Sequence, residues 1–135
     1  MTSNVRFLNP PTISKPPGYT HVVEVTAPGR LIYIAGQLGL DTQGNLVGGP
    51  GDPGAQIRQA FANLKAALSA VGADFAHVVK VNNYLTDMGH LPIFREVRDS
   101  YLNKAALPAS TTIAISKLAR EGAVFEIEAV AVLPG

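Results

Sequence analysis

The sequence predicts an α+β domain in which two helices pack on one face of a mixed β-sheet. Runs of alternating apolar residues near both ends of the chain have the period of strands. Two central segments instead have apolar residues spaced by three and four, which is the period of helices. The resulting order is β-ββ-α-β-α-ββ, and strands joined through helices favour one sheet with both helices on the same face.

Three strands are expected before the first helix. Val5–Leu8 is a short strand candidate, and the prolines of Pro10–Gly18 favour extended or turn backbone after it. His21–Thr26 and Leu31–Gly36 both alternate, and Ala27-Pro28-Gly29-Arg30 between them has the residues of a turn. These two strands are therefore predicted to form a hairpin.

A loop and the first helix come next. Asp41–Gly51 is rich in Gly, Asn and Asp, and a turn at Gln43-Gly44-Asn45 is expected to pinch this loop into a small hairpin. Asp52 suits the N-cap of the helix, Pro53 its first position and Gly72 its C-terminal stop. The apolar stripe of the helix consists of Ile57, Phe61, Leu64, Leu68 and Val71.

The second half continues with a strand, a helix and two strands. Val78–Thr86 is rich in β-branched residues, which predicts a strand. A second helix is predicted from Pro92 to about Lys104, before Pro108. Its apolar stripe consists of Phe94, Val97, Tyr101 and Leu102. The closing stretch, Pro108–Val132, contains two alternating runs joined by a polar connection.

Two carboxylates in the last run demand an explanation. Glu126 and Glu128 share one strand face with valines at both ends, which suggests that this face is covered. A covered carboxylate must be hydrogen-bonded or shift its pKa, and a raised pKa suits a general acid or base. Ser110 and Thr112 share one face of the neighbouring run, so a hydroxyl pair beside a carboxylate is expected to hold water or a substrate oxygen. Alternatively, both glutamates are solvated or paired with Lys or Arg.

Two further residues, Gly36 and Tyr19, each have two interpretations, and a third, Arg98, has one. Gly36 ends a strand, where a glycine permits either the close approach of a ligand or another backbone, or a bulge. Tyr19 either projects its phenol over a pocket or covers the edge of the core. Arg98 lies one place beyond the apolar stripe of its helix, which favours a solvated position. No spacing ties a histidine to a serine or to a metal, so neither a nucleophilic triad nor a metal site is predicted.

Composition limits the kind of protein. At 135 residues without cysteine, the chain is expected to form one domain, residues 1–135, that needs no disulfide. Its 47% hydrophobic and 16% charged residues leave few charges to cover a surface, which favours an oligomer. A net charge of +1 without a basic cluster argues against a nucleic-acid partner. No apolar run suits a signal sequence or a membrane span, so a soluble, cytoplasmic protein without a membrane partner is expected.

The most distinctive segments are LIYIAGQLGLD, the pair AQIRQAFANLKAALSAVGA and HVVKVNNYLTD, and the closing PASTTIAI and FEIEAVAV. Together they resemble the Rid family, also called the YjgF/YER057c/UK114 family. The resemblance spans roughly Tyr19 to Val132. It implies a chorismate-mutase-like fold, a barrel-like homotrimer and ligand clefts between the subunits.

The resemblance also implies an activity. Members similar to the archetype hydrolyse reactive enamines and imines formed by pyridoxal-phosphate enzymes, release ammonia and a 2-keto acid, and need no cofactor. The glutamate of the family matches Glu126, which is expected to position or activate water as the catalytic residue. Tyr19 matches the pocket tyrosine and Gly36 the glycine, while Arg98 stands where an asparagine near the cleft is usual.

One position departs from the family pattern. An arginine in a PARS-like motif binds the substrate carboxylate in the family, whereas this chain has Ser110 in PAST. A serine has neither a charge nor a bidentate fork for a carboxylate. With Ser110, Thr112 and Gly36 binding the polar groups of the substrate, a small-molecule hydrolase of altered preference is expected. The alternative is a non-catalytic trimer that binds a metabolite or a protein in the same clefts.

Overall fold

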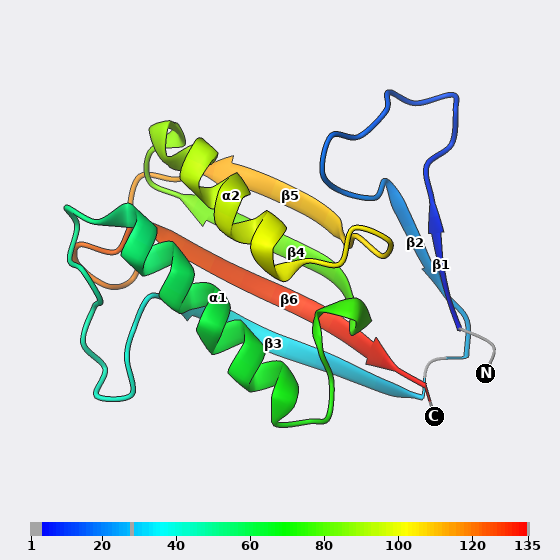
Figure 1. Ribbon diagram of the computed structural model, residues 1–135, viewed down its shortest axis with the longest axis horizontal. Coiled ribbons are helices and arrows are strands. Elements are labelled where there is room, and N and C mark those ends of the chain that lie inside the picture. Colours follow the sequence, from blue (N-terminus) through cyan, green and yellow to red (C-terminus); the bar gives the residue numbers. More distant parts are fainter. Residues whose placement is uncertain (1–3, 28, 135) are drawn as a thin grey trace.

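The computed structural model describes residues 4–27 and 29–134. Its main elements, in chain order, are β1 (Val5–Leu8), β2 (Val22–Val25), β3 (Arg30–Leu38), α1 (Pro53–Ser69), β4 (Val78–Leu85), α2 (Leu91–Tyr101), β5 (Ala109–Ala114) and β6 (Phe125–Leu133). Short 3-10 turns at Phe75–His77 and Met88–His90 precede β4 and α2. Figure 1 shows α1 and α2 on one face of a sheet and the pair β1 and β2 apart from it.

The main sheet has four strands in the order β3-β6-β4-β5. Strand β6 pairs antiparallel with both β3 and β4, whereas β4 and β5 are parallel and are joined through α2. The sheet is therefore mixed, as the sequence predicts. Strand β6 has a neighbour on each side, and β5 forms an edge.

The predicted hairpin between His21–Thr26 and Leu31–Gly36 is wrong. Strand β2 pairs with β1, and β3 pairs with β6. Alternation predicts a strand without predicting its partner. Strands β3 and β6 have nine residues each, and β2 has four, so β6 offers β3 the longer ladder. Pro28, in the predicted turn, lies outside the described residues.

Helix α1 follows its predicted pattern closely. The Asp52 side chain accepts a hydrogen bond from the Ala55 N–H at 3.0 Å, which caps the first turn. Gly72, three residues after the helix, has φ +77°, a conformation that favours glycine. Four members of the predicted stripe are at most 1% exposed, namely Ile57, Phe61, Leu64 and Leu68.

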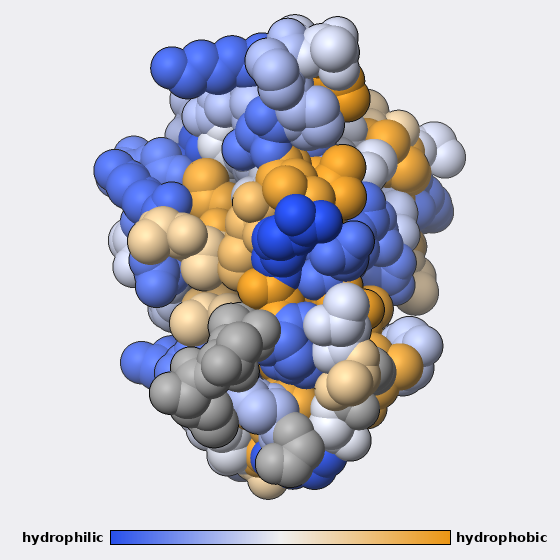
Figure 2. All heavy atoms as spheres, turned by 90° about the vertical axis from the view of Figure 1, so that its right-hand side faces the viewer, coloured by the Kyte–Doolittle hydropathy of each residue, from blue (hydrophilic) through white to orange (hydrophobic). Residues whose placement is uncertain are grey.

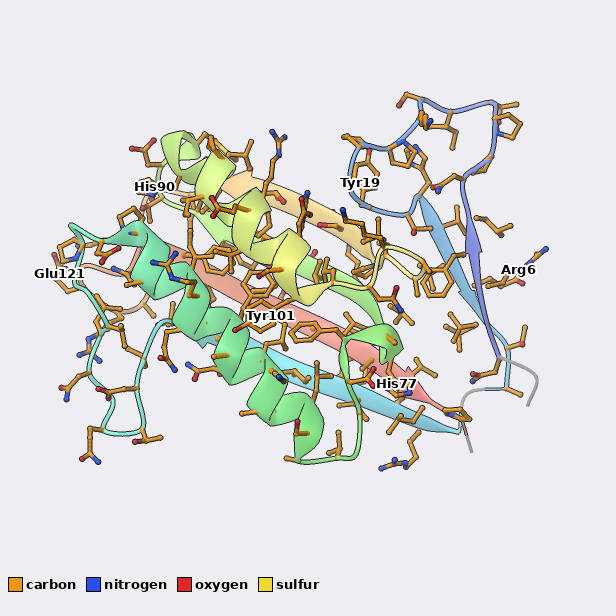
Figure 3. All side chains as sticks on the ribbon, in the orientation of Figure 1. Arg6, Tyr19, His77, His90, Tyr101 and Glu121 are labelled. Carbon is orange, nitrogen blue, oxygen red and sulfur yellow. The ribbon has the colours of Figure 1, made fainter. Side chains whose placement is uncertain are left out.

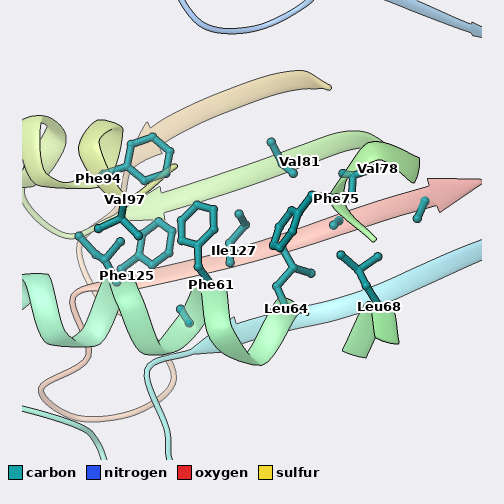
Figure 4. Close-up of a cluster of buried hydrophobic side chains, with 14 of the residues drawn as sticks. Phe61, Leu64, Leu68, Phe75, Val78, Val81, Phe94, Val97, Phe125 and Ile127 are labelled. Atoms are coloured by element: carbon teal, nitrogen blue, oxygen red, sulfur yellow. The ribbon is translucent and has the colours of Figure 1, made fainter. Parts of the chain in front are cut away.

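An aromatic cluster joins the helices to the sheet (Figure 4). The Phe61 ring of α1 lies 6.0 Å from that of Phe125 in β6 and 5.3 Å from that of Tyr101 in α2. Phe94 lies 5.5 Å from Phe125. Stacked and tilted rings at these separations add to the apolar area that they bury. The core therefore lies between the two helices and one face of the four-stranded sheet.

The second helix is shorter than predicted. It ends at Tyr101 instead of near Lys104, because Leu102 has extended backbone with ψ 144°. The side chain of Asn103 then accepts a hydrogen bond from the Ala105 N–H at 2.9 Å. An asparagine side chain that bonds to nearby backbone favours a turn over a helix, and the turn at Asn103 therefore fits a helix end well before Pro108.

A buried glutamine holds the loop before α1 in place. The small hairpin predicted in this loop is present, because Leu40 and Leu46 form a β-bridge. Gln56 is 0% exposed, and its Nε2 donates to the carbonyls of Gly49 at 2.7 Å and Gly122 at 3.0 Å. Its Oε1 accepts from the Val124 N–H at 2.9 Å. This side chain therefore ties the loop to the start of β6.

Candidate functional site

The six predicted site residues form two groups on opposite faces of the four-stranded sheet. Ser110 and Thr112 are paired with Val81 and Asn83 of β4, which face the helices and are 3% and 1% exposed. Glu126 is paired with Tyr84, which points to the other face because successive strand residues alternate. The expectation that the hydroxyl groups of Ser110 and Thr112 lie beside Glu126 is therefore wrong within one chain.

The separation follows from topology. The sequence brings the runs of β5 and β6 close along the chain, but β4 lies between them in the sheet. A parallel pair needs a crossover connection, and α2 provides it between β4 and β5. Closeness along the chain therefore does not make β5 and β6 neighbours.

Four predicted site residues line one cleft of about 530 Å³ beside α2, which we call the α2 cleft. They are Tyr19, Arg98, Ser110 and Thr112. The Thr20 N–H donates to the Pro108 carbonyl at 3.1 Å, which holds the neighbouring Tyr19 near the start of β5. Figure 3 shows Tyr19 on the loop that precedes β2, beside this edge of the sheet. Tyr19 therefore lines a cleft, which is one of its two predicted positions.

A buried amide orients the two hydroxyl groups of this cleft. Asn83 Nδ2 lies 3.0 Å from Ser110 Oγ, 3.2 Å from Thr112 Oγ1 and 3.2 Å from the Thr111 carbonyl. A hydroxyl that accepts from an amide keeps its own hydrogen for another acceptor. Sequence reasoning missed Asn83, although an asparagine pair inside the apolar run VVKVNNYLT was a visible signal.

Arg98 is not in the solvated position that its place on the helix favoured. Its side chain is 15% exposed, and its Cζ atom lies 5.7 Å from the centre of the Phe94 ring. Its Nε donates to Oδ1 of Asp99 at 3.0 Å. A guanidinium over an aromatic face is attracted by the ring as well as by the carboxylate. Arg98 therefore brings a positive charge to the α2 cleft.

Glu126 lines a second cleft, of about 380 Å³, on the opposite face of the sheet. Tyr84 and Glu128 line it too, and the Tyr84 hydroxyl donates to Glu128 Oε1 at 2.7 Å. Asn82 Nδ2 lies 3.1 Å from the same oxygen. Partial burial raises the pKa of Glu126 above its ordinary value, and the nearby charge of Glu128 raises it further. The hydrogen bond to Glu128 is the main cause that raises the pKa of Tyr84.

Gly36 and Glu126 lie in contact. The register of β3 with β6 shifts between Ile34 and Gln37, so Gly36 lies in an irregular part of the strand. A Cβ atom at this position would lie 2.7 Å from Cδ of Glu126. The irregular pairing fits the predicted bulge, whereas the group that approaches Gly36 in this structure is the side-chain carboxylate of Glu126 and not another backbone.

The sheet face that carries Glu126 is open in a single chain. The helices cover the other face, so the predicted covering of Glu126 and Glu128 is not provided by this chain (Figure 1). Leu31 and Tyr33 of β3, 51% and 76% exposed, and Ile113 of β5, 43% exposed, lie on the open face. On another side, which carries β1 and β2, Figure 2 shows apolar patches scattered among polar residues.

The described residues contain no group of three His, Cys, Asp or Glu side chains that could hold a metal ion. Two histidines have local partners instead. His21 Nε2 lies 2.6 Å from the Ser14 carbonyl oxygen, and His77 Nδ1 accepts from the Asp74 N–H at 3.0 Å. Within residues 4–27 and 29–134, no helix combines the length and the apolar character needed to cross a membrane.

Comparison with known proteins agrees with this fold. The sequence model of a family described as Endoribonuclease L-PSP matches residues 12–133. The chain is 40% identical over 114 residues to Protein DfrA of Myxococcus xanthus, covering 84% of each chain. It is 40% identical over 115 residues to a mouse (Mus musculus) protein named 2-iminobutanoate/2-iminopropanoate deaminase, covering 84% of this chain and 80% of the mouse protein.

A similar fold is found in the crystal structure of a protein of the conserved Rid family from Yersinia pestis. That protein is 34% identical to this chain, and the two structures match with a TM-score of 0.83. The match covers 96% of this chain and 99% of the other. Since the family model, the relatives and the fold agree over most of the chain, the protein belongs to the Rid (YjgF) family.

Proposed function

We propose that this protein is a small-molecule hydrolase of the enamine/imine deaminase type, with altered substrate preference, that works as a soluble, cytoplasmic homotrimer. The observation that carries the proposal is Glu126, a half-buried carboxylate with a raised pKa that lines a cleft. Such a group can act as a base near neutral pH. The mouse relative named 2-iminobutanoate/2-iminopropanoate deaminase supports the choice of reaction.

In the proposed reaction, water adds to the carbon of a C=N bond. The Glu126 carboxylate takes one proton from the water as its oxygen bonds to carbon. The proton then passes to the nitrogen to give a carbinolamine. The Glu126 carboxylate next carries the proton of the new hydroxyl group to the nitrogen as the C–N bond breaks and ammonia leaves, so that imine and water become a carbonyl compound and ammonia. A positioned general base of this kind contributes about 10²- to 10⁴-fold in rate.

We also propose that the site is completed between two subunits. Within one chain the sheet separates the α2 cleft from Glu126, so one copy cannot present all six predicted residues to a single substrate. The open face has large apolar residues, of which Tyr33 is 76% exposed, and exposed apolar surface of this kind favours association. The α2 cleft of one subunit would meet Glu126 and Gly36 of its neighbour.

The test is ammonia release by the purified protein from 2-iminobutanoate that an amino-acid-consuming enzyme generates in the assay. Glu126→Gln should lower the rate about 10²- to 10⁴-fold. Glu121→Gln is the matched control, because the side chain of Glu121 is 87% exposed and bonds only with Lys117 among the described residues. An unchanged rate in the Glu126 variant would remove this residue from the mechanism.

A second candidate is a non-catalytic trimer that binds a metabolite or protein in the same clefts. Ser110 at the position of the family's arginine favours it, because a serine brings no charge to hold a substrate carboxylate. A broad panel of imines without turnover, together with a ligand that raises the melting temperature, would support this candidate over the hydrolase. With a net charge of +1, we propose no nucleic-acid partner for either candidate.

A further inference from the structure

We infer that Arg98 is the specificity-determining cation of the α2 cleft, which binds the carboxylate of a small 2-imino or 2-oxo acid, and that Gly18 makes its placement possible. The inference rests on the proposed function for the substrate class. It gives the chain a positive charge at the cleft where Ser110 replaces an arginine. Three observations support it independently.

The first is the state of the guanidinium group. Its Nε bonds to Asp99, whereas no described residue accepts a hydrogen bond from Nη1 or Nη2. Asp99 is 52% exposed, so water weakens its hold on the charge of Arg98. The charged side chains that line the cleft are Arg95, Arg98 and Asp99, which leaves one net positive charge. A pair of free Nη donors matches the two oxygens of a carboxylate.

The second is the close approach of Gly18 to that group. A Cβ atom at this position would lie 2.7 Å from Nη2 of Arg98 and 3.0 Å from both Nη1 and Cζ. Any side chain here would have to move the guanidinium or the loop. The loop itself is fixed near β5 by the hydrogen bond between Thr20 and Pro108, 3.1 Å long. A side chain at position 18 would therefore displace the guanidinium end of Arg98 from this place, so we assign Gly18 as a positioning residue.

The third is the pair of hydroxyl donors across the cleft. Ser110 and Thr112 both accept from Asn83, which is 1% exposed and cannot turn freely. Their hydrogens are therefore available to an acceptor in the cleft. A cation and two hydroxyl donors around one cleft of about 530 Å³ suit an anionic oxygen acceptor of small size.

The experiment measures binding without turnover. The probe is 2-oxobutanoate, the carbonyl product expected from 2-iminobutanoate, and its dissociation constant is obtained by titration followed by NMR. Butanone, in which a methyl group replaces the carboxylate, and inorganic phosphate are titrated in parallel. We expect measurable binding of 2-oxobutanoate and at least tenfold weaker binding of the other two. Equal binding of butanone or phosphate would overturn the carboxylate assignment.

Variants then test the two residues. Arg98→Gln and Gly18→Ala should each weaken 2-oxobutanoate binding about 10- to 100-fold. Arg58→Gln, an exposed arginine of α1 outside this cleft, should bind like the wild type. An unchanged dissociation constant in Arg98→Gln would contradict the inference. If a melting curve shows that this variant is unfolded, Arg98→Lys is tested in its place. Lysine keeps the positive charge but lacks the planar guanidinium, so this variant should bind 2-oxobutanoate with intermediate affinity.

Moving the arginine from α2 to β5 should restore the binding that Arg98→Gln loses. In the double variant Arg98→Gln/Ser110→Arg, the positive charge returns to the same cleft from β5, so 2-oxobutanoate binding should recover. No recovery, with the fold intact, would contradict a simple exchange of cations between α2 and β5. If the wild type hydrolyses no imine but binds 2-oxobutanoate through Arg98, the proposed function fails and the inference stands. If Arg98→Gln hydrolyses 2-iminobutanoate with unchanged kcat and KM, the inference fails and the proposed function stands.

Discussion

A Cβ atom added to Gly36 would lie 2.7 Å from Cδ of Glu126, so the glycine and the carboxylate occupy adjoining space. An alanine at position 36 must therefore displace the Glu126 side chain or shift β3. This contact links the irregular segment of β3 to the group that we place at the chemical step.

Gly36→Ala should lower imine hydrolysis nearly as much as Glu126→Gln does, because a base displaced by about 1 Å loses a large part of its effect. Gly51→Ala is the matched control, since nothing lies within 4 Å of a Cβ atom there. The measurement is kcat/KM of each purified variant. Full activity in Gly36→Ala would show that the position of Glu126 seen here does not matter for the reaction.

The pH dependence of activity should change when the negative charge of Glu128 is removed. A base works when deprotonated, so the rate falls as pH decreases through the pKa of Glu126. Glu128 raises that pKa, after burial as the larger cause. Glu128→Gln removes the charge and keeps an oxygen that can accept from Tyr84 and Asn82. The acid limb of the rate profile should therefore move to lower pH, and a limb that stays or moves up would contradict the assignment of the base.

Gln56 should contribute strongly to stability. Gln56→Ala leaves the Val124 N–H and the carbonyls of Gly49 and Gly122 without their partner. We expect the free energy of unfolding to fall by about 3 kcal/mol, because each buried group left unpaired costs roughly 1–3 kcal/mol. Gln43→Ala, in an exposed turn, should change it by less than about 0.5 kcal/mol. Urea denaturation measures both, and equal effects would argue against the role of Gln56.

The helices and strands could be predicted because each has a clear period. The stripe of α1 is buried as its spacing indicates, and the cap and stop residues lie where their chemistry suits them. Pairing could not be predicted in the same way. Alternation in β3 fits any antiparallel partner, and only the folded sheet shows that β6 takes the place expected for β2.

The sequence indicates candidate site residues, but it does not indicate how they are arranged. Ser110, Thr112 and Glu126 were singled out by their faces along their own strands, yet β4 places them on opposite sides of the sheet. Asn83 and Gln56 escaped notice because their burial depends on contacts with segments far along the chain. Periodicity gives the face of a side chain within one strand or helix, and the neighbours on that face come from the tertiary fold.

The most direct test of the account is whether two inactive subunits restore each other. Thr112→Phe should block the α2 cleft, and Glu126→Gln should remove the base, so each variant alone is expected to be inactive. When the two are co-expressed and mixed oligomers are verified by mass spectrometry, some clefts combine an intact α2 cleft with an intact Glu126 from another subunit. We predict a substantial recovery of ammonia release from 2-iminobutanoate. Mixed oligomers no more active than the two parents, or an active monomer, would contradict a site completed between subunits.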